Sequence, residues 1–156
     1  MNPIQEKLAA LGLIIPPTPK PLGSYIPAVR TGNLVFVSGQ LPMVEGQLRF
    51  KGKIGKELDI AQGQEASRIC LLNILAALGV AGVIPQDVIR VVRLGGFVQC
   101  VDGFVDQPKV INGASDLCRD LFGEAGIHAR AAVGVSALPL DAAVEIEAVF
   151  EVRSLS

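Results

Sequence analysis

Residues 142–153 have the sequence AAVEIEAVFEVR, in which apolar and charged side chains alternate more clearly than elsewhere in the chain. A period of two residues predicts a strand with one buried face and one face in contact with water or a cleft. The fold is therefore expected to contain a sheet with one covered face. The two sets of side chains are Val144, Ile146, Ala148, Phe150 and Val152 on the apolar face, and Glu145, Glu147, Glu151 and Arg153 on the other.

The segments just upstream predict strand, helix and strand. Residues 129–137 are rich in Ala and Val and favour a strand with Arg130, Ala132, Gly134 and Ser136 on one face. Residues 107–122 have helical spacing, with a proline tolerated in the first turn. Residues 87–101 are rich in Val, Ile and Leu and predict a long strand.

The first half of the chain predicts a hairpin, a short strand and a helix. Thr31-Gly32-Asn33 is a turn signal between residues 26–30 and 34–37, and a further short strand is expected at 47–51. Asp59 and Gln62 have the spacing of a capping box, so a helix should begin there, and Gly79 is expected to end it.

A short helix at residues 3–11 and a proline-rich stretch at 16–21 precede the hairpin. We therefore expect an N-terminal extension at residues 1–22 and a single domain at residues 23–156. The element order ββ(β)αβαββ predicts an α+β fold. Its expected form is a six-stranded, largely antiparallel mixed sheet with two helices on one face, plus the short N-terminal helix.

Composition predicts a soluble chain that associates with itself. Half of the residues are hydrophobic and the mean hydropathy is +0.47, yet no uncharged apolar run reaches the roughly 18 residues of a membrane helix. Burial between identical subunits would account for the surplus apolar surface. The N-terminus does not resemble a secretion signal, and the three cysteines have no metal spacing, so we expect a cytoplasmic protein with buried, reduced thiols.

Charge and motifs exclude several classes of function. The net charge is −1, there is no basic cluster, and aromatic residues make up 4%, so nucleic acid is not an expected partner. No metal-ligand cluster or phosphate-binding glycine loop occurs, and we predict no cofactor. The chain has one histidine, which makes a Ser-His triad at Ser38 an unattractive interpretation.

Several motifs, taken together, resemble the RidA/YjgF family. The family's "(P)AR", "LP" and "(V/I)EIEA" elements are similar to residues 128–139 (HARAAVGVSALP) and 144–148 (VEIEA). Its "GPY", "SGQ(I/L)P" and "(V)N" elements are similar to residues 23–25, 37–42 and 110–112, and all occur in family order. The resemblance implies a chorismate-mutase-like fold and a homotrimer whose three sheets form a central barrel, with clefts between subunits.

The resemblance also implies an activity, the hydrolysis of 2-aminoacrylate-type enamines and imines to 2-keto acids and ammonia. Arg130 would bind the substrate carboxylate through two parallel hydrogen bonds, and Glu145 would activate water and handle protons. Glu147 is the nearest competitor for the role of Glu145. The residues expected to line the cleft and bind substrate are Tyr25, Asn112, Ser38 and the backbone around Ala132.

The chain departs from the family pattern at two positions near Arg130. Ala132 stands where many members have Cys, so no thiol belongs to the expected mechanism. His128 stands where Pro is usual, and we expect it to be a surface or turn residue. The chain is also longer than typical members and resembles the longer, chorismate-mutase-like subgroup, for which substrate identity does not carry over.

Three other functions remain open. The first is a non-catalytic trimer that binds small metabolites such as 2-keto acids, which would need Arg130 but not Glu145. The second is a ribonuclease, which the missing basic face disfavours. The third is chorismate rearrangement, which rests on fold alone and would need more cationic anchors, with candidates Arg30, Arg90 and Arg93.

Overall fold

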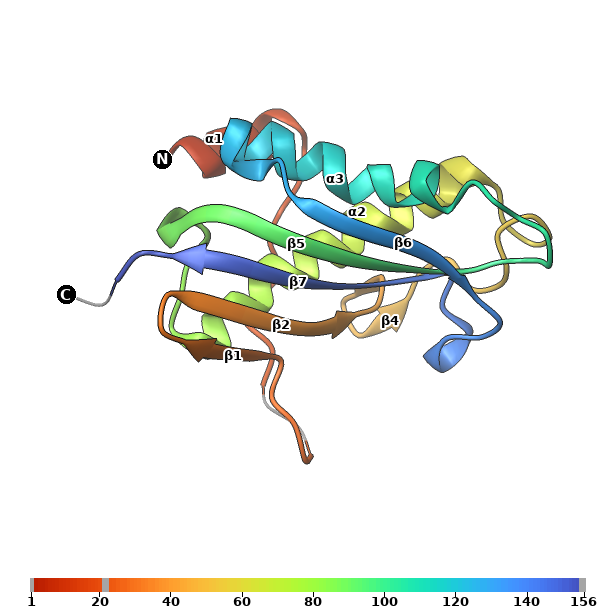
Figure 1. Cartoon of the computed structure of the whole chain (residues 1–156), viewed down its shortest axis with the longest axis horizontal. Helices are drawn as coiled ribbons and strands as arrows, with labels where there is room; N and C mark the ends of the chain where they lie inside the picture. The colour runs from red at the N-terminus through yellow and green to blue at the C-terminus, as the bar shows by residue number, and fades with distance from the viewer. Residues whose placement is uncertain (1, 21–22, 155–156) are drawn as a thin grey trace.

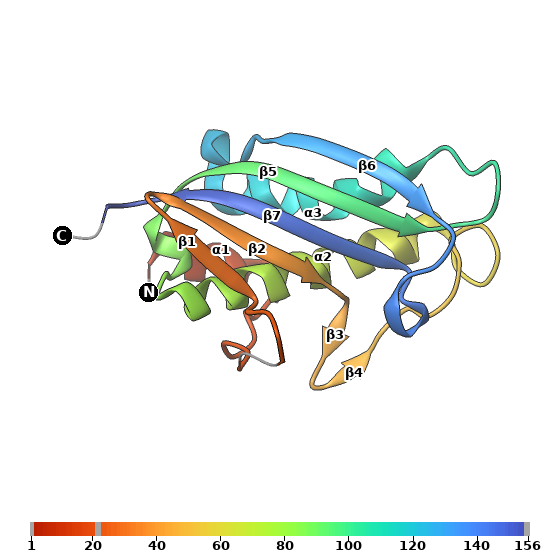
Figure 2. The ribbon, with the colours of Figure 1, turned by 60° about the horizontal axis from the view of Figure 1, so that its bottom comes forward.

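The structure is a computed structural model that describes residues 2–20 and 23–154. Three helices lie on one side of a five-stranded sheet, and a two-stranded ribbon extends from one end of that sheet (Figures 1 and 2). The helices are α1 (Pro3–Ala10), α2 (Ile60–Ala77) and α3 (Gln107–Phe122). The strands are β1 (Ala28–Thr31), β2 (Leu34–Gln40), β5 (Val88–Gln99), β6 (Ala129–Val135) and β7 (Val144–Val152) in the sheet, and β3 (Met43–Val44) and β4 (Gln47–Leu48) in the ribbon.

The predicted alternation of the last strand is confirmed. Every second residue of β7, from Val144 to Val152, is buried, and the residues between them are half-exposed. β7 pairs antiparallel with β2 and β5, so it lies in the middle of the sheet order β1-β2-β7-β5-β6. β6 pairs parallel with β5 at one edge. The sheet is therefore mixed and mostly antiparallel, and the α+β interpretation is confirmed.

The expected sixth strand does not join the main sheet. The predicted strand at 47–51 shortens to Gln47–Leu48 and pairs with β3 in a separate ribbon. Phe50, with a φ of 60°, turns the chain away after it, and Lys51 makes only an isolated bridge to Ala142. The left-handed backbone at Phe50 interrupts the extended conformation that a longer strand would need.

α2 begins at its capping box and packs closely against α3. The Asp59 carboxylate accepts from the Gln62 amide and the Gln62 side chain accepts from the Asp59 amide, as predicted. A Cβ atom at Gly113 would lie 2.2 Å from the carbonyl oxygen of Gln64, so the two helix backbones touch. Residues 60–81 are long and apolar enough to cross a membrane, but here they pack on the sheet beside α3.

The end of α2 differs from the prediction at Gly79. A 3-10 turn (Leu78–Ala81) continues the helix, and the left-handed glycine that closes it is Gly82, with a φ of 71°. Gly79 serves another purpose, because a Cβ atom there would lie 2.2 Å from the Thr18 hydroxyl oxygen. The N-terminal extension therefore packs onto the domain, and Leu8 of α1 joins the same hydrophobic core.

Within the described residues, no helix covers the second face of the sheet (Figure 2). Strand pairing places five apolar side chains on the face away from the buried row of β7. They are Val29, Phe36, Val149, Phe97 and Val133. Val29, Phe36 and Val133 are 50%, 46% and 45% exposed. Part of the apolar surplus in the composition therefore lies on this open face, defined by these five side chains.

Candidate functional site

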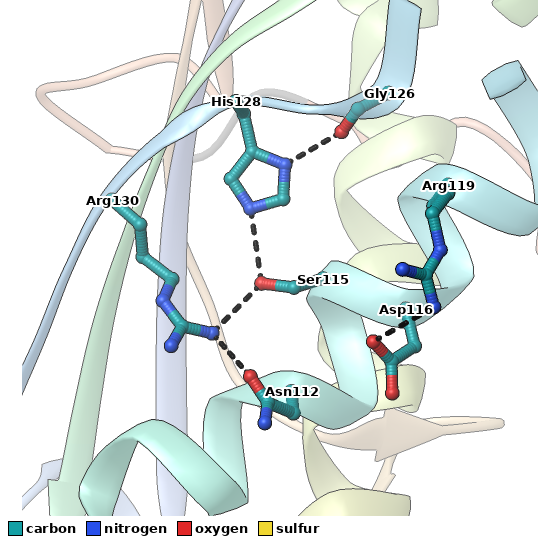
Figure 3. Close-up of polar contacts among 7 residues, drawn as sticks. All are labelled: Asn112, Ser115, Asp116, Arg119, Gly126, His128 and Arg130. Carbon is teal, nitrogen blue, oxygen red and sulfur yellow. Dashed lines mark hydrogen bonds and ion pairs between the residues drawn. The ribbon is translucent and has the colours of Figure 1, made fainter. Parts of the chain in front are cut away.

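Arg130 lies on the helix-covered face of β6 and reaches α3 (Figure 3). It stands in register with Leu94, which is fully buried, and this register turns the Arg130 side chain toward the helices. Its Nη1 atom donates to Asn112 Oδ1 at 2.7 Å and to Ser115 Oγ at 3.0 Å. The structure thus brings together Arg130 and Asn112, two residues that the sequence predicted, and adds Ser115.

These two bonds leave the other edge of the guanidinium available. Nη1 carries two hydrogens, and both are directed at α3. Among residues 2–20 and 23–154, no carboxylate lies within ion-pair distance of Arg130. The Nε–H and Nη2–H groups form a planar fork that matches the two oxygens of a carboxylate.

His128 also belongs to this cluster of side chains around Arg130. The sequence interpretation did not place it there. Its Nε2 atom lies 2.9 Å from Ser115 Oγ, and its Nδ1 atom lies 2.6 Å from the carbonyl oxygen of Gly126. The histidine is half-buried rather than a free surface residue. Spacing could have revealed it, because positions 128 and 130 share a strand face and positions 112 and 115 share a helix face.

A small cavity of about 230 Å³ opens beside this cluster. On its α3 side, Arg119 and Asp116 form an exposed ion pair with a separation of 3.7 Å (Figure 3). The cavity borders Ser115 and His128 as well as Arg130. Its lining consists of Ser115, Asp116, Arg119, Gly126, Ile127, His128 and Arg130.

Glu145 lies on the open face, above β2. A Cβ atom at Gly39 would be 2.8 Å from Glu145 Cδ, so the glycine makes room for this carboxyl group. Partial burial raises the pKa of Glu145, and the negative charge of Glu147 raises it further. Among the described side chains, no cation lies within ion-pair distance of Glu145.

Glu147 has a different environment on the same strand. Its Oε1 atom lies 3.4 Å from Nη1 of Arg93, and Gly95 leaves the space that this pair occupies. Arg30, another candidate cation, donates to the carbonyl oxygens of Gly32 and Arg153 at the far end of the sheet. Arg93 lies on the face opposite to Arg130, whereas Arg30 shares the face of Arg130 but lies on β1, at the other edge of the sheet.

Ser38 and Tyr25 lie on the Glu145 side of the molecule. Ser38 precedes Gly39 and donates its hydroxyl to the carbonyl oxygen of Ile26 at 3.1 Å. Tyr25, one residue before Ile26, is 66% exposed. Ala132, by contrast, follows Arg130 on β6 and packs against the hydrophobic core.

Within one chain, the two predicted catalytic residues lie on opposite faces of the sheet. Arg130 is in register with Leu94, and Leu94 with Ala148, which belongs to the buried row of β7. Glu145 belongs to the alternate row and therefore points to the other face. The structure places Arg130, Asn112 and Ala132 in one group and Glu145, Ser38 and Tyr25 in another.

The cysteines take no part in either group. Cys70, Cys100 and Cys118 are all free and buried, as predicted. Burial raises the pKa of Cys118 to about 12 and that of Cys70 well above its usual range, so both thiols stay protonated at neutral pH. In the part of the chain that the structure describes, no group of three or more His, Cys, Asp or Glu side chains is placed to hold a metal ion.

Comparison with known proteins identifies one family. The family model described as "YjgF/chorismate_mutase-like, putative endoribonuclease" matches residues 5–151. Protein TCP17 of Trypanosoma cruzi is 39% identical over 97% of this chain and 95% of its own length. A 2-iminobutanoate/2-iminopropanoate deaminase of Dermatophagoides farinae is 33% identical over 86% of this chain and 90% of its own.

Two crystal structures show how the backbone compares. Atu1372 of Agrobacterium tumefaciens, a protein of unknown function, has a TM-score of 0.90 and 43% identity, over 97% of this chain and 93% of its own. Escherichia coli TdcF with bound serine has a TM-score of 0.58 and 28% identity, over 88% of this chain and 94% of its own. The match to Atu1372 extends over more of this chain than the match to TdcF does.

Proposed function

This chain belongs to the YjgF/chorismate mutase-like family, and on that premise we propose that it hydrolyses small carboxylated enamines and imines of the 2-aminoacrylate type. The products are a 2-keto acid and ammonia. The family's fold, expected from the sequence motifs, is confirmed by the family match and the structural neighbours. The observation that carries the proposal is that Arg130 is held through Nη1 alone, which leaves its Nε–Nη2 fork without a hydrogen-bond partner among the described residues.

Arg130 is the proposed anchor for the substrate carboxylate. A charge-assisted pair of hydrogen bonds to a guanidinium is worth about 1.5–3 kcal/mol and fixes the plane of the bound group. The relative from Dermatophagoides farinae is named for 2-imino acids, each of which carries a carboxylate, and TdcF was crystallised with serine, another carboxylate. Both ligand classes suit the fork.

Glu145 is the proposed acid/base. An enamine substrate first becomes the imine by moving a proton from nitrogen to C3. Water then adds to C2, and Glu145 accepts one water proton and passes it to the nitrogen, which gives a carbinolamine. Glu145 next takes the hydroxyl proton of the carbinolamine and passes it to the nitrogen, so the C2–N bond breaks and ammonia leaves with the 2-keto acid. A carboxyl group whose pKa is raised is better suited to this exchange near neutral pH than an ordinary one. Glu147 is a weaker candidate, because its carboxylate already pairs with Arg93.

Two copies of the chain would complete one site. Because Arg130 and Glu145 lie on opposite faces of one sheet, we assign the Arg130 group to one subunit and the Glu145 group to its neighbour. The uncovered apolar face and the edge strand β6, with half of its backbone groups unpaired, both favour association. Three copies with their open faces inward would form the barrel that the resemblance implies.

The test measures keto-acid release from enzymatically generated 2-aminoacrylate and from bulkier imino acids. Wild type should accelerate release, Arg130→Ala should abolish the acceleration, and Glu145→Gln should lower kcat by about a hundredfold or more. Glu147→Gln is the matched control on the same strand and should retain more activity than Glu145→Gln. An inert wild type across the panel would overturn the proposal, and binding of 2-keto acids would then test the metabolite-binding alternative.

A further inference from the structure

We propose that Ser115 and His128 are positioning residues, which together hold Arg130 so that its Nε–Nη2 edge faces a carboxylate substrate. The inference rests on the proposed function, since it concerns how that site binds its substrate. The two residues form a continuous chain of hydrogen bonds from the carbonyl of Gly126 to the guanidinium of Arg130 (Figure 3).

The direction of the hydrogen bonds follows from the chemistry of the first partner. The carbonyl oxygen of Gly126 has no proton to donate, so Nδ1 of His128 must carry the hydrogen in their 2.6 Å bond. In the neutral ring, Nε2 is then the acceptor. Ser115 Oγ, at 2.9 Å, must therefore donate its only hydrogen to His128.

This direction leaves the Ser115 oxygen free to accept from Arg130. With its hydrogen committed to the imidazole, Oγ presents lone pairs to Nη1 at 3.0 Å. Asn112, one helical turn earlier on α3, accepts the second Nη1 hydrogen at 2.7 Å. Two acceptors from one rigid helix hold the guanidinium plane, and the plane decides where the free fork points.

The fork needs this support because Arg130 is otherwise exposed on an edge strand. A mobile arginine loses rotamer freedom when it binds a ligand, whereas one that is already held loses less. Hydrogen bonds to the substrate must also be parallel, which a tilted guanidinium cannot provide. Removal of Ser115 should therefore weaken carboxylate binding without changing the chemistry.

The surrounding charges provide a matched control. Asp120 lies on α3 five residues after Ser115, is exposed, and does not line the cavity beside Arg130. Asp120→Asn therefore changes a charge on the same helix while it leaves the hydrogen-bond chain intact. It should bind and turn over substrate as wild type does.

A structural experiment tests the inference independently of any activity. Crystal structures of the wild type, Ser115→Ala and Ser115→Thr would show the conformation of Arg130 directly. We expect one guanidinium position in the wild type and in Ser115→Thr, which keeps the hydroxyl, and a turned or divided position in Ser115→Ala. An unchanged Arg130 in Ser115→Ala would overturn the inference even if the enzyme activity is confirmed.

A kinetic experiment tests the consequence for binding. Ser115→Ala should raise KM, and the inhibition constant of pyruvate, by about two- to tenfold, because binding must then also immobilise the Arg130 side chain, with little change in kcat. His128→Ala should have a smaller effect that disappears in the Ser115→Ala background, because His128 acts through Ser115. The inference would be contradicted if His128→Ala raised KM just as much in the Ser115→Ala background, or if Ser115→Ala left KM unchanged. If wild type neither turns over nor binds, the proposed function fails, and the crystal structures still decide the positioning.

Discussion

Arg130 and Glu145 lie on opposite faces of one five-stranded sheet, although they are the pair on which the proposed reaction depends. Arg130 shares its face with Leu94 and the buried row of β7, whereas Glu145 belongs to the row between them. No side-chain rotation brings the two together within one subunit. A reaction that uses both must therefore take them from two copies of the chain.

Mixing two inactive variants tests this arrangement. Arg130→Ala subunits keep Glu145, and Glu145→Gln subunits keep Arg130. In a mixed assembly of the proposed kind, some interfaces would therefore pair an intact Arg130 with an intact Glu145 of the neighbouring subunit. Random mixing at equal amounts should recover about a quarter of the wild-type sites. Keto-acid release after the variants are unfolded and refolded together is the measurement. Activity that stays at the level of the separately refolded variants would show that each subunit holds its own site, or none.

A charge on the open face should prevent assembly. Phe36 is 46% exposed there, and Phe36→Glu would place a carboxylate in the surface that the proposed trimer buries. Sedimentation should show a smaller species than wild type. Ile84→Glu is the matched control, because Ile84 is 56% exposed but lies beside the N-terminal helix. Dissociation of both variants, or of neither, would contradict the predicted interface.

Stability should depend on pH through Glu145. Its pKa is raised above 4.5 in the folded chain, so the folded state holds this proton when the unfolded state has released it. The free energy of unfolding therefore falls as pH rises from about 4.5 through the folded-state pKa. Glu145→Gln should have a higher Tm than wild type above this window and a similar Tm below it. An equal Tm of the two proteins above this window would contradict the prediction.

The contact between α2 and α3 should tolerate no added methyl group. A Cβ atom at Gly113 would lie 2.2 Å from the backbone carbonyl of Gln64, and a backbone atom cannot turn aside as a side chain can. Gly113→Ala should cost about 1–3 kcal/mol of unfolding free energy, measured by urea denaturation. Asp116→Ala, exposed on the same helix, is the control and should change it by less than about 0.5 kcal/mol. Equal stability of the two variants would show that the helices can separate at no cost.

Much of the fold could be predicted from the sequence because its signals are local. The alternation in β7, the capping box at Asp59 and the bounds of α3 each depend on residues a few positions apart. The length of the strand predicted at 47–51 is an overestimate. The left-handed backbone at Phe50 interrupts the strand, and neither glycine nor proline occupies that position to indicate it in the sequence. The role of Gly79 was also misassigned, because its neighbour Thr18 is distant in sequence.

The candidate site, like the fold, could be predicted from the sequence only in part. The sequence by itself determined which residue types are available, and its periodicity placed Arg130 and Glu145 each on one face of its own strand. Only the tertiary structure decided that those faces are opposite, because strand order and register arise from packing between distant segments. The same is true of Ser115 and His128, which meet Arg130 only where α3 packs against β6. A hydrogen bond depends on distances of a few tenths of an ångström, which the packed core sets and the order of residues does not.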